Sequence, residues 1–164
     1  MISNLRNIKV RYFFTSNVIP YQKSNRKYFL QVNKMKLTIY THSPRMANCT
    51  GLTNIKNIIQ YQKLLEHIFR KKVLRSVIDC FFFSKKNYYN LKIPKLISEL
   101  KHDARFFIFY NPEIFCGIMI HSKEHPTMML YRTGSFVIMG GKTLDQIQEC
   151  ESFLLNVIDK VKNE

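Results

Sequence analysis

Two stretches of this chain, about 90 residues apart, repeat the same order of residue types. The first reads Leu37-Thr38-Ile39-Tyr40-Thr41, then Cys49-Thr50-Gly51; the second reads Met128-Met129-Leu130-Tyr131-Arg132, then Met139-Gly140-Gly141. The offset is 90 from the glycine onward and 91 before it, so one inserted residue in the turn Ser43-Pro44-Arg45 accounts for the slip. Solenoids need three or more shorter repeats. Two copies therefore predict a duplicated α+β unit, each copy reading strand, turn, strand, glycine, helix.

Local patterns place the secondary structure of both copies. Alternation and β-branched or aromatic content predict strands over residues 7–14, 28–32, 36–40, 73–83, 104–110, 116–122, 127–132 and 135–139. A first helix is expected after a cap at Thr53 or Asn54, a short one over 93–100, and a long one after the T-x-x-Q capping box that begins at Thr143. We divide the chain into a basic segment 1–35, the remainder of a first repeat 36–72, and a second repeat 73–164. Residues 1–35 read either as strands of an incomplete first repeat or as a basic arm.

Composition is that of an intracellular globular protein. The chain has 164 residues, of which 46% are hydrophobic, and lacks an apolar run long enough to span a membrane. Its four cysteines, Cys49, Cys80, Cys116 and Cys150, show neither a CxxC pair nor Cys/His ligand spacing, so we expect reduced thiols and no metal site.

The net charge of +15 is concentrated in one half of the chain. Residues 1–75 hold fifteen Lys and Arg against one acid, whereas residues 76–164 hold eleven against ten. This asymmetry favours binding to a polyanion, most simply nucleic acid. Two alternatives stay open: a solvated basic face, and an organellar presequence in the acid-free stretch 1–21.

Enzymatic motifs are absent from the sequence. The five histidines form no HExxH or triad pattern, and Gly140-Gly141-Lys142 lacks the earlier glycine of a P-loop. We therefore predict a non-enzymatic protein that needs no cofactor.

One segment resembles a known family. Residues 110–142 resemble the C-terminal repeat of the TATA-binding protein family, and more closely its divergent relatives in large DNA viruses. Asn111-Pro112-Glu113-Ile114-Phe115-Cys116-Gly117 is similar to the stirrup motif acid-Pro-Glu-Leu-Phe-Pro-Gly. The run from Leu130 to Lys142 is similar to the family's Ile-Phe-x-Ser-Gly-Lys-x-Val-x-Thr-Gly-Ala-Lys. The resemblance covers about 73–158 in the second repeat but only about 36–68 in the first.

The resemblance implies an α+β saddle built from a duplicated curved antiparallel sheet, with long helices on its convex face and an incomplete first repeat. Its concave face would bind A·T-rich double-stranded DNA in the minor groove, a mode for which TATA-binding proteins are the standard example. The implied DNA-binding residues are Thr38, Tyr40, Asn48, Thr50, Ser76, Ile78, Phe115, Met129, Tyr131, Val137 and Met139. Phe115 and Tyr131 match the family's intercalating pair, whereas Leu130, Phe136 and Ile138 should pack under the helices.

The resemblance also implies partners and a location. Glu113 and Ile114 match stirrup positions that bind a B-type initiation factor, so we expect a general transcription initiation factor that recruits this partner and RNA polymerase. Such a factor acts in the nucleus or, if it is viral, in a cytoplasmic viral factory.

Several positions depart from the family pattern. Met139 replaces a threonine, Ser135 a lysine, and Ser76 an asparagine that contacts bases. In the first repeat Tyr40 matches one wedge, but no Phe stands at the spacing of the other, and there is no room for a short helix. An alternative function is therefore an interaction module of the same fold that joins a transcription complex without bending DNA.

Overall fold

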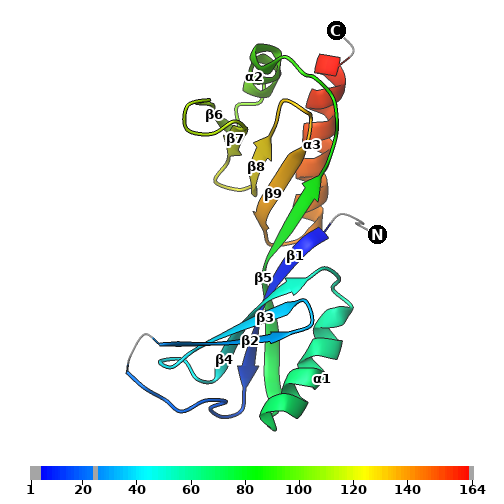
Figure 1. Ribbon diagram of the computed structural model, residues 1–164. Coiled ribbons are helices and arrows are strands. Elements are labelled where there is room, and N and C mark those ends of the chain that lie inside the picture. The colour runs from blue at the N-terminus through cyan, green and yellow to red at the C-terminus, as the bar shows by residue number, and fades with distance from the viewer. Residues whose placement is uncertain (1–4, 24–25, 163–164) are drawn as a thin grey trace. The chain divides into compact units, whose positions relative to one another are not determined.

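The computed structural model describes residues 5–23 and 26–162, and their contacts divide them into two compact units. The first unit comprises residues 5–80 and the second begins at Phe81. The strand order is β2-β3-β4-β1-β5-β9-β8-β7-β6, and every pairing with a resolved register is antiparallel. β5 (Val73–Lys85) runs from the first unit into the second (Figure 1). The predicted α+β class is confirmed.

The first unit is a sheet with one helix on one of its faces. Its strands are β1 (Leu5–Phe14), β2 (Lys27–Val32), β3 (Met35–Tyr40), β4 (Met46–Leu52) and the first part of β5, and its helix is α1 (Asn57–Phe69). Every second residue of β1 from Ile8 to Phe14 is buried, as expected for a strand with one face against a core. The Tyr12 hydroxyl donates to the Ile58 carbonyl of α1 at 3.1 Å, and the rings of Phe14 and Phe69 meet edge to face at 5.6 Å.

Residues 5–14 and 27–32 are strands of the sheet, so the first of our two interpretations of the N-terminal segment is the one observed where the structure describes it. The buried side chains of β1 are part of the first unit's core. The unit has one helix within its described residues, in keeping with the missing short helix.

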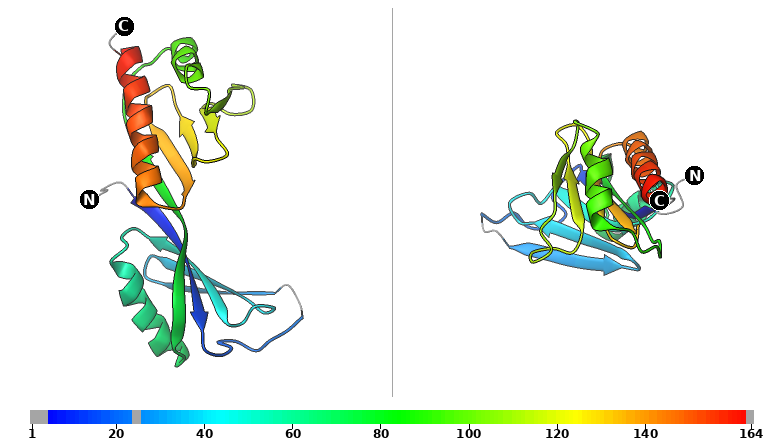
Figure 2. Two further views of the ribbon diagram at one scale, coloured as in Figure 1. Left: turned by 180° about the vertical axis from the view of Figure 1, so that it is seen from behind. Right: turned by 90° about the horizontal axis from the view of Figure 1, so that it is seen from above.

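The second unit adds two helices to its strands. Its elements after β5 are α2 (Ile93–Lys101), β6 (Phe107–Phe109), β7 (Ile118–His121), β8 (Thr127–Leu130), β9 (Phe136–Gly141) and α3 (Leu144–Lys162). α3 lies along β8 and β9 in two opposite views (Figures 1 and 2). Met128, Leu130, Phe136 and Ile138 are at most 1% exposed, which confirms the predicted inward positions. The stripe Ile147, Leu154, Val157 and Ile158 on α3 is buried as well.

When the two units are aligned by their strand pairing, the glycines match with an offset one residue different from the offset of the repeated sequence. Gly51 and Gly140 both have a positive φ, 91° and 86°, and both lie where the strand register shifts. The residues after them, Leu52 and Gly141, pair with Ile8 and Phe81 respectively. Gly51 therefore corresponds to Gly140, and not to Gly141 as the repeated sequence suggested.

Candidate nucleic-acid interface

The uncovered face of the second unit's sheet, which we call its open face, carries two rows of side chains. In one row Ser84 pairs with Val137, Val137 with Met129, Met129 with Met119, and Met119 with Phe109. In the other, Phe82 pairs with Met139 and Met139 with Thr127, whose hydroxyl lies 3.3 Å from Nδ1 of His121. These residues alternate with the buried ones, so both rows leave the sheet on the side away from α3. The predicted residues Met129, Val137 and Met139 are thus neighbours on one surface.

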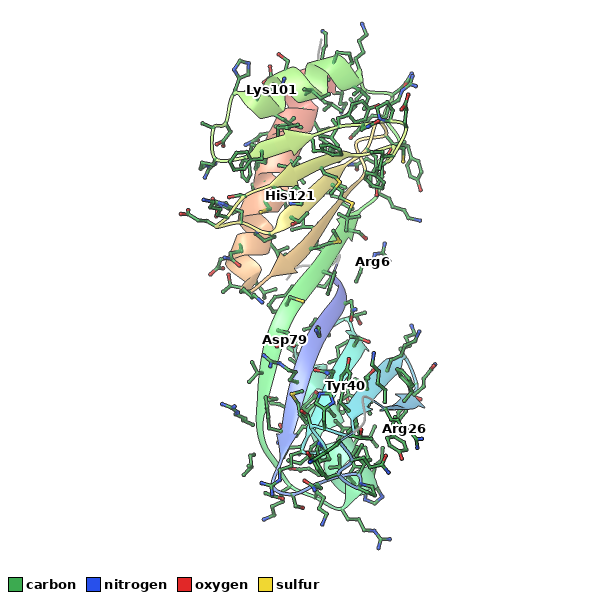
Figure 3. The ribbon with its side chains drawn as sticks, turned by 90° about the vertical axis from the view of Figure 1, so that its left-hand side faces the viewer. Arg6, Arg26, Tyr40, Asp79, Lys101 and His121 are labelled. Atoms are coloured by element: carbon green, nitrogen blue, oxygen red, sulfur yellow. The ribbon has the colours of Figure 1, made fainter. Side chains whose placement is uncertain are left out.

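This surface is apolar and holds no Lys or Arg in either row. Its charge-bearing candidate is His121 at the end of β7, labelled in Figure 3. A flat array of Met, Phe, Val, Ser and Thr offers van der Waals contact and few directional donors. That is the surface that the degenerate acceptor pattern of a minor groove requires.

The stirrup brings the two predicted wedge residues together. The rings of Phe115 and Tyr131 lie 5.9 Å apart with an interplanar angle of 64°, an edge-to-face arrangement. A Cβ on Gly117 would lie 2.8 Å from the Phe115 ring and 3.0 Å from the Tyr131 ring, so glycine is needed at this position to leave space for the pair. The resemblance matched these two residues to the family's intercalating pair, and in the structure their rings are in contact.

The rest of the stirrup is a turn held by its first residue. The Asn111 carbonyl accepts hydrogen bonds from the amides of Ile114 and Phe115, and the Asn111 Oδ1 accepts from the Glu113 amide at 3.0 Å. Ile114 is 74% exposed at the tip and Glu113 is exposed beside it. Both predicted partner-binding residues are therefore accessible.

The open face of the first unit, opposite α1, is more polar. Thr38 pairs with Asn48 and Lys36 with Thr50, and Arg11 of β1 continues the first of these rows by pairing with Asn48. The predicted residues Thr38, Asn48 and Thr50 form one half-buried patch. Tyr40, labelled in Figure 3, lies beyond them opposite Lys27.

Tyr40 has a different environment from Tyr131. The Lys27 Nζ lies 5.2 Å above the Tyr40 ring, and the His42 ring lies 5.3 Å from it on the chain just after β3. In the second unit, the residue one position beyond the last β7–β8 pair is Gly117. Because Gly117 has no side chain, the Phe115 ring can lie beside Tyr131. The first unit has a lysine in that place, so a cation–π contact stands where the second unit has an aromatic pair.

Two predicted residues, Ser76 and Ile78, lie outside the rows. The pairing of β5 with β9 begins at Phe81, so Ser76 and Ile78 belong to the first unit. Phe83 pairs with Ile138 in the second unit as Val10 pairs with Cys49 in the first, so Phe83 and Val10 hold equivalent positions. The residues before them, Phe82 and Lys9, are then equivalent as well. Phe82 and Ser84 are the open-face residues of β5 that the sequence reasoning missed. Their alternation with the buried Phe81 and Phe83 was the available signal.

Charge on the first unit is nearly uncompensated. Residues 5–80 hold fifteen Lys and Arg against Glu66 and Asp79. Glu66 accepts from the Val73 amide at 2.8 Å, and Asp79 pairs with Arg11 at 2.6 Å and Lys9 at 3.8 Å. Arg75 lies over the Phe13 ring at 4.5 Å. The positive field predicted from composition therefore belongs to a folded surface, and a polyanion is its natural ligand.

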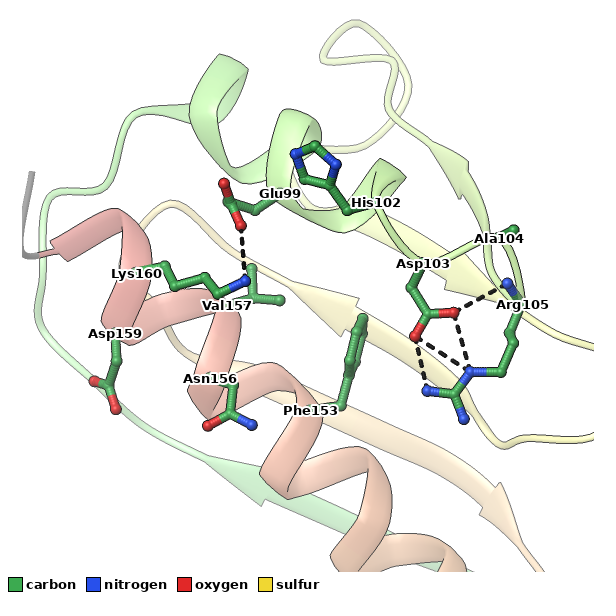
Figure 4. Close-up of a pocket in the computed structure, with 10 residues that line it drawn as sticks. All are labelled: Glu99, His102, Asp103, Ala104, Arg105, Phe153, Asn156, Val157, Asp159 and Lys160. Atoms are coloured by element: carbon green, nitrogen blue, oxygen red, sulfur yellow. Dashed lines mark hydrogen bonds and ion pairs between the residues drawn. The ribbon is translucent and has the colours of Figure 1, made fainter.

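Several cations of the second unit, in contrast, form ion pairs with carboxylates. A cavity of about 790 Å³ between α2 and α3 contains ion pairs of Lys160 with Glu99 at 3.3 Å and of Arg105 with Asp103 at 2.7 Å (Figure 4). The Arg105 guanidinium holds the pKa of Asp103 below its usual value. His125 lies 3.3 Å from Glu149 in the same region. No predicted site residue lines this cavity.

Two of the four cysteines, Cys49 and Cys150, have buried thiols. Burial raises the pKa of Cys49 to about 12 and that of Cys150 to about 11, so both stay protonated at neutral pH. Across residues 5–23 and 26–162, no group of three or more His, Cys, Asp or Glu side chains is placed to hold a metal ion. None of the helices described there is both long and apolar enough to cross a bilayer.

The geometry thus defines a duplicated α+β protein with one helix-covered and one open face in each unit, which is the class of nucleic-acid-binding fold that the sequence suggested. The family model described as "Transcription factor TFIID (or TATA-binding protein, TBP)" matches residues 88–161. The solved structure of Methanococcus jannaschii TBP is similar to 96% of this chain and 98% of its own, with a TM-score of 0.72 at 17% sequence identity. No curated protein sequence matches.

Residues 88–161 match the model of the TATA-binding protein family, and the fold of nearly the whole chain is similar to that of a solved TATA-binding protein. This is a family of DNA-binding transcription factors.

Proposed function

We propose that the protein is an initiation factor that binds A·T-rich duplex DNA in the minor groove through the open faces of its two units. The observation that carries this proposal is the placement of Met129, Val137 and Met139 on one sheet face whose two rows hold no Lys or Arg, together with the contact between the Phe115 and Tyr131 rings at the stirrup. Minor-groove proteins insert apolar side chains between base steps, and the resulting kink lets the groove follow a sheet.

The two units would contribute differently. The second unit supplies apolar contact and a wedge, and the first supplies Lys36, Arg11 and other cations near polar Thr38 and Asn48. Phosphate neutralisation by those cations would provide most of the affinity. In the first unit Lys27 stands where the second unit has the Phe115 ring, so insertion of aromatic side chains between base steps would be weaker at the first unit.

The stirrup would also recruit the transcription machinery. Ile114 is exposed and Glu113 stands beside it, on a turn that is fixed by Asn111. An exposed aliphatic side chain next to a carboxylate suits a B-type initiation factor, with RNA polymerase following. Viral origin, and action in the nucleus or in a cytoplasmic viral factory, stay predictions.

A second candidate function is a protein-interaction module in a transcription complex. The lack of Lys and Arg on the second unit's open face favours it, since an uncharged Met- and Phe-rich surface also suits a protein partner. The two functions differ in their response to salt. Duplex binding must weaken steeply with salt, whereas a flat or absent response favours the module.

Wedge insertion is tested by the double variant Phe115→Ala, Tyr131→Ala. We expect duplex affinity to fall by about tenfold or more, because each aromatic–base contact contributes about 1–3 kcal/mol. Fluorescence anisotropy with an A·T-rich duplex measures this, and the variant Ile59→Ala, Ile68→Ala, altered on α1, is the matched control. Unchanged affinity in the stirrup variant, or an equal loss in the control, contradicts insertion.

A further inference from the structure

The first unit contains a cavity that the duplex-binding proposal does not use. It has a volume of about 490 Å³, and it is lined by Phe13, Tyr21, His42, Pro44, Arg45 and Met46. Phe13 and Met46 are partners across β1 and β4, so they form its sheet-side wall. The turn between β3 and β4 supplies the remaining residues apart from Tyr21, which belongs to the segment that follows β1.

That segment is tied to the turn by backbone hydrogen bonds. The Val18 amide donates to the Pro44 carbonyl at 2.9 Å, and the Gln22 amide donates to the Thr41 carbonyl at 3.2 Å. The Asn17 Oδ1 accepts from the Nε of Arg45 at 3.2 Å. Tyr21 and Arg45 are therefore held at the cavity by structure on both sides, although each is largely exposed.

The charge at the cavity is positive and has no acid partner. The first unit's two acids are engaged elsewhere, Glu66 by the Val73 amide and Asp79 by Arg11 and Lys9. Arg75 is next to the cavity, over the Phe13 ring. Within the described residues, the terminal guanidinium nitrogens of Arg45 have no partner, so this cation is available to an anion.

Aromatic side chains line the same cavity as this cation. Phe13, Tyr21 and His42 line the cavity, and His42 continues to Tyr40 at 5.3 Å and from there to Lys27. A ligand that uses both features has a flat π system and a phosphate. We propose that this cavity binds an unpaired nucleotide, with its base against Tyr21 and His42 and its phosphate on Arg45.

An unpaired nucleotide fits better than a duplex because a paired, stacked base has no free face to offer. Stacking on aromatic side chains beside a basic groove is how proteins bind single strands without sequence preference. The cavity would therefore give the first unit a single-strand site that is distinct from the sheet-face residues Thr38, Asn48 and Thr50. The ligand is either a nucleotide within a single strand or a free mononucleotide, and the experiment separates these sources.

The probe is a thymidine single strand of about 12 nucleotides that carries one 2-aminopurine, whose fluorescence falls when it stacks. We expect quenching with the full-length protein, and the double variant Tyr21→Ala, Arg45→Ala should bind the strand about tenfold or more weakly. The matched control, Tyr28→Ala, Lys63→Ala, removes one exposed tyrosine and one cation elsewhere in the same unit and should change binding by less than about twofold. Both variants should keep the wild-type circular dichroism spectrum, since the altered side chains are mostly exposed.

The outcomes are distinct. Competition by thymidine monophosphate as strong as by the strand assigns the site to a free nucleotide, and much weaker competition assigns it to a single strand. Equal single-strand affinity of the wild type and the Tyr21, Arg45 variant overturns the proposal, as does competition by an acidic peptide at equal charge. If that variant keeps its duplex binding, the cavity is a site separate from the proposed duplex-binding surface. If the wild type binds the single strand but no duplex, the proposed function fails while this inference holds.

Discussion

Gly51 and Gly140 have the same backbone role in the two units but different surroundings. Both adopt a positive φ at a register shift, where a side chain costs about 1–2 kcal/mol from backbone strain alone. A Cβ at Gly51 would also lie 2.1 Å from the Lys34 carbonyl oxygen, whereas nothing lies within 4 Å of one at Gly140. The Gly51 amide further donates to the Asn7 Oδ1 at 2.6 Å.

We therefore expect Gly51→Ala to lower the free energy of unfolding more than Gly140→Ala does. The Gly140 change should cost about 1–2 kcal/mol, and the Gly51 change about 3 kcal/mol or more because the backbone of the β2–β3 turn must move. Urea unfolding followed by circular dichroism measures both. Equal losses of unfolding free energy for the two variants would show that the turn at Lys34 can move without cost, which contradicts this prediction.

The aromatic residues show the same contrast between equal sequence and unequal surroundings. Tyr40 and Tyr131 end equivalent strands, yet one faces a lysine ammonium and the other a phenyl ring. The sequence predicted both tyrosines as DNA-binding residues. Their neighbours, which the fold decides, make the second unit the better candidate for insertion.

At the scale of elements, the helix caps separate one correct prediction from one that was wrong. At α3 the Thr143 hydroxyl accepts from the Gln146 amide at 3.2 Å, which confirms the predicted cap, whereas the Gln146 Oε1 accepts from the Lys142 amide at 2.8 Å, one residue before the amide that a capping box uses. At α1 the cap position is Lys56, without a side-chain hydrogen bond, and Asn54 instead accepts from the Lys56 amide in the preceding turn. Neither Thr53 nor Asn54 is the N-cap.

The variant Thr143→Ala should lower the free energy of unfolding by about 1 kcal/mol, since it removes an N-cap hydrogen bond from a 19-residue helix. Thr143→Ser keeps the hydroxyl and should cost a few tenths of that. Thermal or urea unfolding gives both values, with the exposed Thr53→Ala as the control. An equal loss for Thr53→Ala and Thr143→Ala is the result that contradicts this assignment.

At the scale of the whole molecule, charge is divided between the units. The first unit has fifteen Lys and Arg but only two acids, and both acids already bind groups of β1 and β5. In the second unit, Lys160, Arg105 and Lys85 have carboxylate partners. A cation that already has a partner gains less from a phosphate. Ion release on DNA binding should therefore come mainly from the first unit.

The double variant Lys36→Ala, Arg75→Ala in the first unit tests this division. The slope of log affinity against log salt concentration should become shallower by about 0.9 for each phosphate that the variant no longer neutralises. The control is Lys92→Ala, Lys101→Ala in the second unit, which removes the same charge from the ends of α2. Duplex titrations at several salt concentrations give the slopes, and a control slope that changes as much as the first-unit slope rules out the division.

Much of each unit was predictable because the controlling interactions are local. Alternation along 36–40 and 135–139 identified the strands and their buried sides, and the T-x-x-Q box identified the start of α3. The stirrup motif identified the turn that carries Ile114 and Phe115. These features depend on the periods of strand and helix and on residues a few positions apart.

The equivalence of Gly51 with Gly140, the place of Phe82 on the open face, and the lysine opposite Tyr40 required the tertiary structure. Each depends on strand register, and a shift of one residue exchanges the two faces of a strand. Register is set by bulges and by partners distant in the sequence; the resemblance pointed to Ser76 and Ile78, whereas Phe82 and Ser84 are the β5 residues that pair within the second unit's rows. The sequence by itself determined which residues form strands and helices and which sides are apolar, because those follow from local period; only the tertiary structure decided which side chains meet across the strands, because that follows from pairing.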